Sequence, residues 1–252
     1  MDDRPEIAVV GASVRAAAFS LLRSGRRPLA ADCFGDADLT RCCAATQIAE
    51  YPRQLESWLE QQARARSNLS WCYTGALENY PRLVDRMTRV APLAGNRGQQ
   101  LRAVRSPRKL AAVLAAADLK FPETRVSADG LPRDGSWLAK TYRGASGSGV
   151  AALRSQPLPR GTAYQRRISG TPCAAVFVGD GQAALCLGVT RQLIGESWTG
   201  GGPFQYSGSV GPIPIDTSAA AEIDLLGNVL VEAFELKGLF GVDFLLNDDG
   251  AW

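Results

Sequence analysis

Residues 137–150, WLAKTYRGASGSGV, join an apolar strand to a loop of small residues, mainly glycine and serine. Small residues let a backbone approach a polyanion closely, and their amides can donate hydrogen bonds to phosphate oxygens. Lys140 lies in the strand just before the loop, where it would add a positive charge beside the same anion. In a Walker motif the lysine follows the glycines and a helix comes next, so this segment is of another kind. A hairpin loop that binds nothing is the alternative interpretation.

A second candidate lies near the end of the chain, where the run Gly238–Leu246 places one carboxylate in an otherwise apolar strand. We expect Asp243 to be buried. A buried, unpaired carboxylate is costly, so it needs a cation, a metal ion or strong hydrogen-bond donors. Oxygen ligands of this type suit Mg²⁺ bound to nucleotide phosphates. A structural ion pair is the alternative.

The N-terminal segment reads as a strand at Ile7–Val10, a turn beginning at Gly11, a helix over 14–24 and a second strand that ends at Asp32. This order predicts an open, parallel α/β domain. The turn lacks the second and third glycines of a dinucleotide fingerprint, although Asp32 stands where a ribose-binding acid would stand. We therefore favour another anion or substrate at the start of this helix, around Gly11 to Arg15.

Beyond residue 104 the pattern changes to short strands, glycine turns and two helices. Ser106 followed by Pro107 is typical of a helix start, with a capping residue and proline at the first helical position. The further predicted elements are an antiparallel pair at Val176–Val178 and Ala183–Leu187 with a turn at 179–181, a helix over Ile223–Leu236 with Gly238 near its end, and a last strand over Gly241–Leu246.

Composition excludes several classes of function. The chain has 28 basic and 25 acidic side chains, so no nucleic-acid partner is expected. It has no histidine, which excludes mechanisms that need an imidazole base. The six cysteines form no metal-binding spacing, and we expect them to be small buried hydrophobes. No apolar stretch is long enough to span a bilayer, and we expect a cytoplasmic protein without a membrane partner.

These pieces, in this order, resemble the ATP-grasp superfamily across nearly the whole chain. The resemblance implies an α/β and α+β protein: an N-terminal open parallel α/β (pre-ATP-grasp) domain at residues 1–104, then a two-lobed ATP-grasp domain at 105–252. The lid lobe would span about 121–178 and the C-terminal lobe about 179–252. ATP and Mg²⁺ would bind between these lobes.

The resemblance also assigns roles to residues. Lys109 and Lys140 would contact the nucleotide phosphates, and Asp243 would be the first magnesium ligand. The lid loop over the phosphates would comprise Gly144, Ser146, Gly147, Ser148 and Gly149. The hinge that holds adenine, largely through its backbone, would comprise Gln165, Arg166, Arg167 and Ile168. In the family a glutamate and an aromatic residue usually stand where this sequence has Gln165 and Arg167.

Residues 188–195 and 206–212 look like a subgroup linked to one-carbon metabolism on tetrahydromethanopterin. Within them, Arg191 is the candidate catalytic residue that stabilises the transferred phosphoryl group or an acyl-phosphate. Family members continue into a Glu-x-Asn motif that completes the magnesium site, whereas this sequence ends at Trp252. We therefore expect a truncated chain with an incomplete ATP-grasp domain. A two-metal site cannot be assembled from Asp243 alone, so we do not expect turnover from this chain by itself.

The predicted function is that of an ATP-dependent ligase, which activates a small carboxylate as an acyl-phosphate for attack by an amine or another nucleophile. Charge neutralisation and positioning by lysines, a glycine loop and magnesium suit such a reaction without histidine. One alternative is a non-catalytic nucleotide-binding protein with the same fold. Another is an NAD(P)-binding enzyme that uses the N-terminal domain. A homodimer is the default expectation for assembly.

Overall fold

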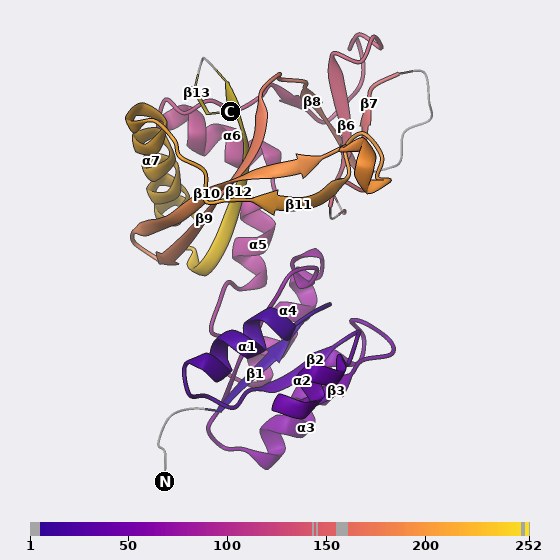
Figure 1. The fold of residues 1–252 in the computed structure, drawn as a ribbon, viewed down its shortest axis with the longest axis vertical. Coiled ribbons are helices and arrows are strands. Elements are labelled where there is room, and N and C mark those ends of the chain that lie inside the picture. The colour runs from indigo at the N-terminus through magenta and orange to yellow at the C-terminus, as the bar shows by residue number, and fades with distance from the viewer. Residues whose placement is uncertain (1–5, 143, 145, 155–160, 248–249, 252) are drawn as a thin grey trace. The chain divides into compact units, whose positions relative to one another are not determined.

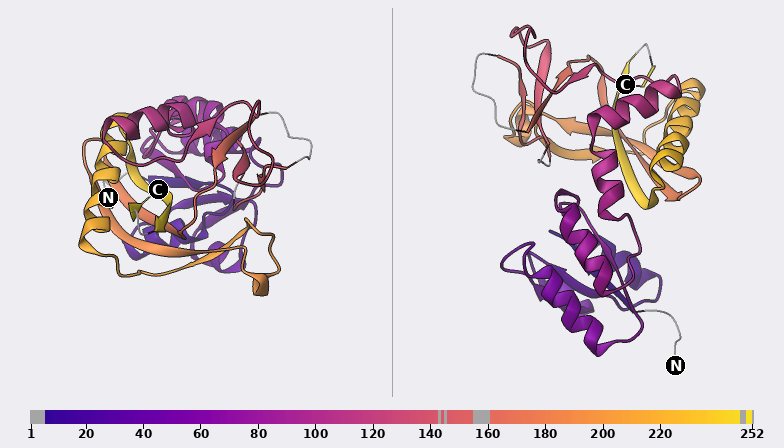
Figure 2. Two further views of the ribbon diagram at one scale, coloured as in Figure 1. Left: turned by 90° about the horizontal axis from the view of Figure 1, so that it is seen from above. Right: turned by 180° about the vertical axis from the view of Figure 1, so that it is seen from behind.

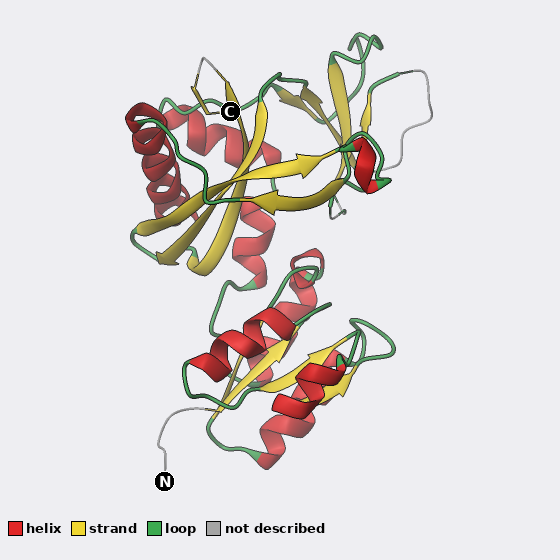
Figure 3. Cartoon of the chain, viewed as in Figure 1, coloured by secondary structure: helices red, strands yellow, loops and turns green. Residues whose placement is uncertain are grey.

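The computed structural model describes residues 6–142, 144, 146–154, 161–247 and 250–251 (Figure 1). The chain forms two compact units, Met1–Arg102 and Ala103–Trp252. The first is a parallel α/β unit, and the second contains two antiparallel sheets with helices (Figure 3). This confirms the predicted fold class.

Unit 1 is built on a parallel sheet in the order β3-β2-β1-β4. Its two central strands, β1 and β2, are largely buried on both faces, as expected when helices cover both sides. Helices α1 and α2 pack on one face, around Val9 and Leu39, and α3 and α4 pack on the other, around Trp71. The strands are β1 (Glu6–Val10), β2 (Leu29–Asp32), β3 (Ala44–Gln47) and β4 (Leu69–Tyr73). The helices are α1 (Arg15–Arg23), α2 (Ala37–Cys42), α3 (Leu55–Ala65), the short η1 (Leu77–Asn79), α4 (Pro81–Val90) and α5 (Gly98–Val104).

Unit 2 contains a small antiparallel sheet, the lid sheet, in the order β5-β8-β6-β7. Its strands are β5 (Thr124–Arg125), β6 (Trp137–Thr141), β7 (Val150–Ala152) and β8 (Thr162–Arg166). Trp137, Ala139 and Tyr164 point to one side of this sheet, where they form a small core with Leu153. Strand alternation therefore places Leu138 and Lys140 on the other face.

The larger sheet of unit 2 has the order β11-β10-β9-β12-β13, and we call it the main sheet. Its strands are β9 (Thr171–Asp180), β10 (Ala184–Ile194), β11 (Tyr206–Val210), β12 (Lys237–Asn247) and β13 (Gly250–Ala251), with the short η2 (Ser197–Thr199) between β10 and β11. Helix α7 (Thr217–Phe234) packs Ile223 against Phe177 on one face, and α6 (Pro107–Ala116) packs beside α7. Figure 2 shows α6 in magenta and α7 in gold next to each other on that side. Among the residues that the structure describes in unit 2, no helix packs on the other face of the main sheet.

Two features of the main sheet differ from the sequence prediction. The turn of the β9–β10 hairpin lies at residues 181–183, two residues later than expected, because Gly179 still pairs with Ala184. Helix α7 ends at Phe234, and the next residue, Glu235, adopts a left-handed conformation with φ of 52°, whereas Gly238 already pairs with β9. The ladder between β12 and β9 explains both differences, because each residue added to it gains backbone hydrogen bonds.

Asp216 caps α7, and its replacement tests how much this helix depends on the cap. Its carboxylate accepts a hydrogen bond from the amide of Ala219 at 2.9 Å. Because the cap satisfies an otherwise free amide and places a negative charge at the helix N-terminus, we expect Asp216→Ala to lower the free energy of unfolding by about 1 kcal/mol. Urea denaturation would measure this loss. Asp224→Ala, on the exposed face of α7, is the control. An equal loss in both variants would contradict the role of the cap.

Candidate functional site

Lys140 lies on β6, on the face of the lid sheet opposite to Trp137. Its Nζ donates a hydrogen bond to Oε1 of Gln165 at 2.5 Å. Nε2 of Gln165 in turn donates to Oγ1 of Thr124 at 3.1 Å. The lysine is therefore held by a neutral amide from the adjacent strand β8, which is itself held from β5.

Asp243 lies on β12, on the face of the main sheet that no helix covers. Its neighbours Val242 and Phe244 pack into the core under α7, so alternation turns Asp243 to the open face. The prediction that Asp243 is buried was wrong, because the residue is exposed. One carboxylate oxygen accepts a hydrogen bond from Nε2 of Gln192 at 2.7 Å. An apolar strand can hold a carboxylate at little cost when helices cover only one face of its sheet.

Asp243 acts electrostatically on Lys140 although the two residues belong to different sheets. Burial lowers the pKa of Lys140, because removal from water disfavours the ammonium form, and the negative charge of Asp243 raises it. Together with their partners Gln165 and Gln192, the two residues form what we call the Lys140–Asp243 group. The group combines a cation, a carboxylate and two amides. This set suits an anion that binds together with a metal cation.

In the predicted lid loop, residues 146–149 form a turn that leads into β7. The amide of Thr141 donates to the carbonyl of Gly149 at 3.0 Å, and Gly147 and Gly149 have φ of 78° and 81°. The carbonyl of Ser146 accepts from the amide of Tyr206 at 3.1 Å, and a Cβ at Gly147 would collide with the carbonyl oxygen of Phe204. Glycine is therefore required for the loop to approach the start of β11. Gly144 and Ser148 of the predicted loop are exposed.

The structure does not bring together every residue of the predicted site. Lys109 is exposed in the first turn of α6, and no hydrogen bond or ion pair among the described residues links it to the Lys140–Asp243 group. In the predicted hinge, the amide of Arg166 donates to the carbonyl of Glu123 at 2.8 Å, and that of Arg167 donates to the carbonyl of Ser136 at 2.9 Å. These two amides are already used within the protein. Their side chains are exposed, and Ile168 is half-buried.

Arg191 lies on the wrong face of the main sheet for its predicted role. It pairs with Cys173, which points into the core, whereas Asp243 pairs with the next residue, Ala174. Cross-strand partners share a face, so Arg191 and Asp243 face opposite sides. Arg191 instead forms an ion pair with Glu196 at 3.5 Å. The structure therefore gives no support for Arg191 at a transferred phosphoryl group.

In unit 1, Asp32 is not placed to bind a ribose. It is only 1% exposed, and its carboxylate accepts hydrogen bonds from the amides of Val14 at 3.1 Å, Phe34 at 3.1 Å and Gly35 at 2.9 Å. The carboxylate ties the start of α1 to the loop after β2. It also uses an amide at the N-terminus of α1 that a dinucleotide pyrophosphate would need.

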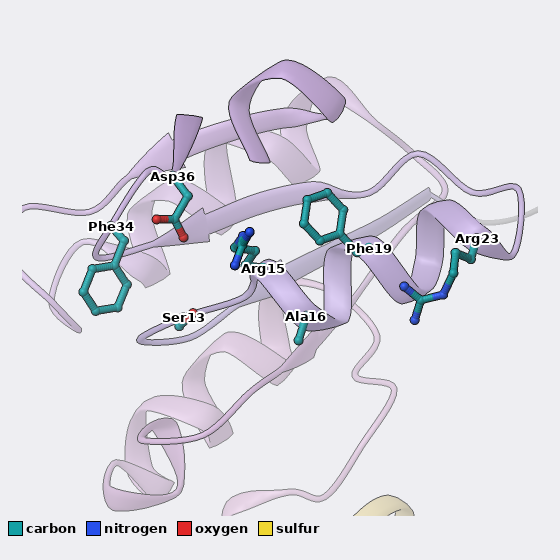
Figure 4. A pocket seen from close by; sticks show the side chains of 7 residues that line it. All are labelled: Ser13, Arg15, Ala16, Phe19, Arg23, Phe34 and Asp36. Carbon is teal, nitrogen blue, oxygen red and sulfur yellow. The ribbon is translucent and has the colours of Figure 1, made fainter. Parts of the chain in front are cut away.

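An open pocket of about 620 Å³ lies beside the start of α1 (Figure 4). Figure 4 shows Phe34 and Asp36, on the loop after β2, across from Ser13 and Arg15. Arg15 forms an ion pair with Asp38, and its guanidinium lies 5.6 Å from the ring centre of Phe19. The lining residues are Ser13, Arg15, Ala16, Phe19, Arg23, Phe34 and Asp36.

The residues of the Lys140–Asp243 group can supply one ligand to a magnesium ion. Mg²⁺ in nucleotide sites is usually held by one or two carboxylates together with phosphate oxygens and water, and the exposed carboxylate of Asp243 can be one of these. No group of three or more acidic or cysteine side chains in the described part of the chain could hold a metal alone. The six cysteines are free thiols; Cys173 is buried as expected, whereas Cys42 is exposed. No described helix is long and apolar enough to cross a membrane.

Comparison with protein families shows to which family unit 2 belongs. The model of the ATP-grasp domain matches residues 105–252, which is more than half of the chain. The chain belongs to the ATP-grasp family. No curated protein sequence matches it closely enough to count as a relative.

Solved ATP-grasp structures share the fold at low sequence identity. An ATP-grasp superfamily protein from Archaeoglobus fulgidus is 16% identical, with a TM-score of 0.68 over 98% of this chain and 78% of its own. N5-carboxyaminoimidazole ribonucleotide synthetase from Thermus thermophilus is 14% identical, with a TM-score of 0.73 over 97% and 69%. The biotin carboxylase domain of 2-oxoglutarate carboxylase from Hydrogenobacter thermophilus, solved with MgADP, is 13% identical, with a TM-score of 0.72 over 97% and 62%.

Sequence reasoning missed two residues that hydrogen-bond to members of the Lys140–Asp243 group: Thr124, which accepts from Gln165, and Gln192, which donates to Asp243. Gln192 stands next to the chosen Arg191, and alternation alone predicts that the two face opposite sides. Which of them shares a face with Asp243 depends on the pairing of β10 and β12 with β9, which is not visible in a single sequence. Thr124 lies in a two-residue strand that has no periodicity to reveal it.

Proposed function

We propose that this ATP-grasp protein is an ATP-dependent ligase that activates a small carboxylate. The observation that carries the proposal is the Lys140–Asp243 group, in which the carboxylate of Asp243 on the main sheet raises the pKa of Lys140 on the lid sheet. A lysine and an aspartate placed in this way can hold a nucleoside triphosphate and its magnesium ion between two sheets. Three solved structures of the same fold are a synthetase, a carboxylase domain bound to MgADP and a protein classified by superfamily, which supports this class of reaction.

In the proposed reaction, a carboxylate oxygen of the substrate attacks the γ-phosphorus of ATP. The bond to the β,γ-bridging oxygen breaks, ADP leaves, and an acyl-phosphate is formed. An amine or another nucleophile then attacks the acyl carbon, loses its proton, and releases inorganic phosphate. Lys140 would neutralise charge on the phosphates, and Gly144, Ser146, Gly147, Ser148 and Gly149 would form the loop over them.

Asp243 would hold Mg²⁺ through the carboxylate oxygens that Gln192 leaves open. The ion, when bound, would supply positive charge beside the phosphates. Gln192 would fix the orientation of the Asp243 carboxylate through its hydrogen bond of 2.7 Å. Lys109 and the hinge residues Gln165, Arg166, Arg167 and Ile168 stay predictions for the rest of the nucleotide site.

Within unit 1, we propose that the pocket beside Ser13 and Arg15 binds the acceptor substrate. It combines two arginines with two phenylalanines, which suits an anionic molecule with an apolar or planar part. The link to tetrahydromethanopterin metabolism, the cytoplasmic location and the homodimer stay predictions. A screen of candidate carboxylates for ADP release would test the link to tetrahydromethanopterin metabolism.

Thermal unfolding with nucleotides tests the proposal on the chain itself. MgATP at about 100 times its dissociation constant should stabilise the folded protein by roughly 2.7 kcal/mol, which gives a clear rise in Tm. ATP with a chelator should give a smaller rise, and NAD or NADP none. A rise with NAD or NADP but none with MgATP would overturn the proposal. MgATP binding without ADP release, in a protein that continues through a Glu-x-Asn motif and for any carboxylate and nucleophile tested, would favour a non-catalytic nucleotide-binding protein.

A further inference from the structure

The turn of the lid loop, residues 146–149, contacts the start of β11, which belongs to the other sheet of unit 2. The carbonyl of Ser146 accepts a hydrogen bond from the amide of Tyr206 at 3.1 Å. A Cβ at Gly147 would collide with the carbonyl oxygen of Phe204, so the two backbones approach closely at this point. We call the meeting of residues 146–147 with residues 204–206 the lid–β11 contact.

The lid turn adopts a backbone conformation that this contact helps to maintain. Ser146 and Gly147 both have positive φ, at 53° and 78°. A residue with a Cβ adopts this left-handed conformation only at a cost, and it persists where the surrounding structure imposes it. For Ser146 the surrounding structure includes the hydrogen bond that its carbonyl accepts from β11.

On the main sheet, Gln205 holds the groups that meet the lid turn. The amide of Gly195 donates to the carbonyl of Gln205 at 3.0 Å, and the amide of Gly202 donates to its side-chain Oε1 at 3.1 Å. These bonds close the loop between β10 and β11. Because Gln205 stands between Phe204 and Tyr206, fixing it also fixes the carbonyl and the amide that face the lid turn.

The lid sheet thus reaches the main sheet at two separate places. The first is the chain itself, which runs from β8 through residues 167–170 into β9. The second is the lid–β11 contact at the edge of the main sheet, where β10 lies between β9 and β11. Gln192, the partner of Asp243, is on β10 and therefore lies between the two attachments. Sheets that separate about the chain connection to admit a ligand between Lys140 and Asp243 would break the lid–β11 contact.

We infer that the lid–β11 contact is a gate, which is closed without nucleotide and must open for nucleotide to enter or leave. This inference rests on the proposed function. A contact that forms equally with and without the ligand favours neither state. Loosening it should therefore raise the rates of binding and release together and leave the affinity nearly unchanged. Loss of a direct phosphate contact would instead lower the affinity.

Exchange of the Tyr206 amide hydrogen, measured by NMR without nucleotide, tests the contact by itself. Gly147→Ala adds the colliding Cβ, so the lid turn can no longer approach Phe204 as closely. We expect exchange at Tyr206 to become about tenfold faster, because its amide loses its acceptor and opens locally more often. An unchanged rate would overturn the inference.

Gly130→Ala is the matched control for this measurement. Gly130 also has positive φ, at 71°, but no described neighbour lies within 4 Å of the position of an added Cβ. It should leave the exchange of Tyr206 unchanged. In both variants the amide of Leu153, which donates to the carbonyl of Trp137 inside the lid sheet, should keep its exchange rate. That result shows that the lid sheet remains folded.

Stopped-flow binding of a fluorescent ATP derivative with Mg²⁺ tests the gate. Gln205→Ala removes the side-chain acceptor of the Gly202 amide and loosens the β10–β11 loop. We expect association and dissociation rates each to rise about fivefold, with Kd within about twofold of the unchanged protein. Gln182→Ala, on the exposed turn after β9, should change neither rate. A faster dissociation alone, with a matching loss of affinity, would show that the loop acts on bound nucleotide and would overturn the gate.

Failure of the gate and failure of the proposed function give different results in this experiment. If the unchanged protein bound no nucleotide, the proposed function would fail and the gate with it. If it bound nucleotide while Gln205→Ala left both rates unchanged, the gate alone would fail and the proposed function would stand.

Discussion

Lys140→Met is expected to weaken MgATP binding about 100-fold or more. The substitution keeps much of the apolar stem but removes the charge of the one ionisable side chain of β6, which is the cation of the Lys140–Asp243 group. Loss of one partner of a partly buried, hydrogen-bonded charge pair typically costs about 2–5 kcal/mol of binding, and about 2.7 kcal/mol corresponds to 100-fold. Isothermal titration calorimetry at physiological salt would measure the change.

Lys237→Met is the matched control, because it removes the same charge from the exposed start of β12. Six residues of extended strand separate it from Asp243, which corresponds to about 20 Å. We expect its MgATP affinity to stay within about twofold of the unchanged protein, because charges at this distance are largely screened. Equal losses in the two variants would show that Lys140 acts through net charge and not through contact with the phosphates.

Asp32→Ala is expected to destabilise unit 1 by about 3 kcal/mol. The substitution leaves the amides of Val14, Phe34 and Gly35 without their acceptor, and a buried unsatisfied donor costs about 1–3 kcal/mol. Faster hydrogen–deuterium exchange of peptides from β1 and β2, read by mass spectrometry, would report the loss for this unit alone. No change in NAD or NADP binding is expected, because the carboxylate has no part in a ribose site.

Asp38→Ala provides the control in the same unit. It removes an exposed ion pair with Arg15, and such pairs contribute little to stability because water and salt screen them. The exchange of β1 and β2 should therefore change little. If Asp32→Ala left exchange unchanged but abolished a measurable affinity for NAD, the N-terminal unit would be a dinucleotide site after all.

The sequence by itself determined those parts of the fold that local patterns specify. The strand, glycine turn and helix at the start of the chain predicted a parallel α/β unit, and β1, α1 and β2 confirm it. Ser106 and Pro107 predicted the start of α6, and the Ser106 hydroxyl does cap that helix. These features depend on residues a few positions apart, so a single sequence contains them.

Only the tertiary structure decided which side chains meet. Asp243 was expected to be buried and is exposed, because α7 covers one face of the main sheet and leaves the other open. Arg191 was chosen as the catalytic residue, yet its pairing with Cys173 turns it away from Asp243. Shifting the register of a strand by one residue moves each of its side chains to the opposite face of the sheet. The register is set by partner strands that are distant in the sequence. The physical reason is that a site built across two sheets depends on long-range pairing, whereas strands, turns and caps depend on their neighbours along the chain.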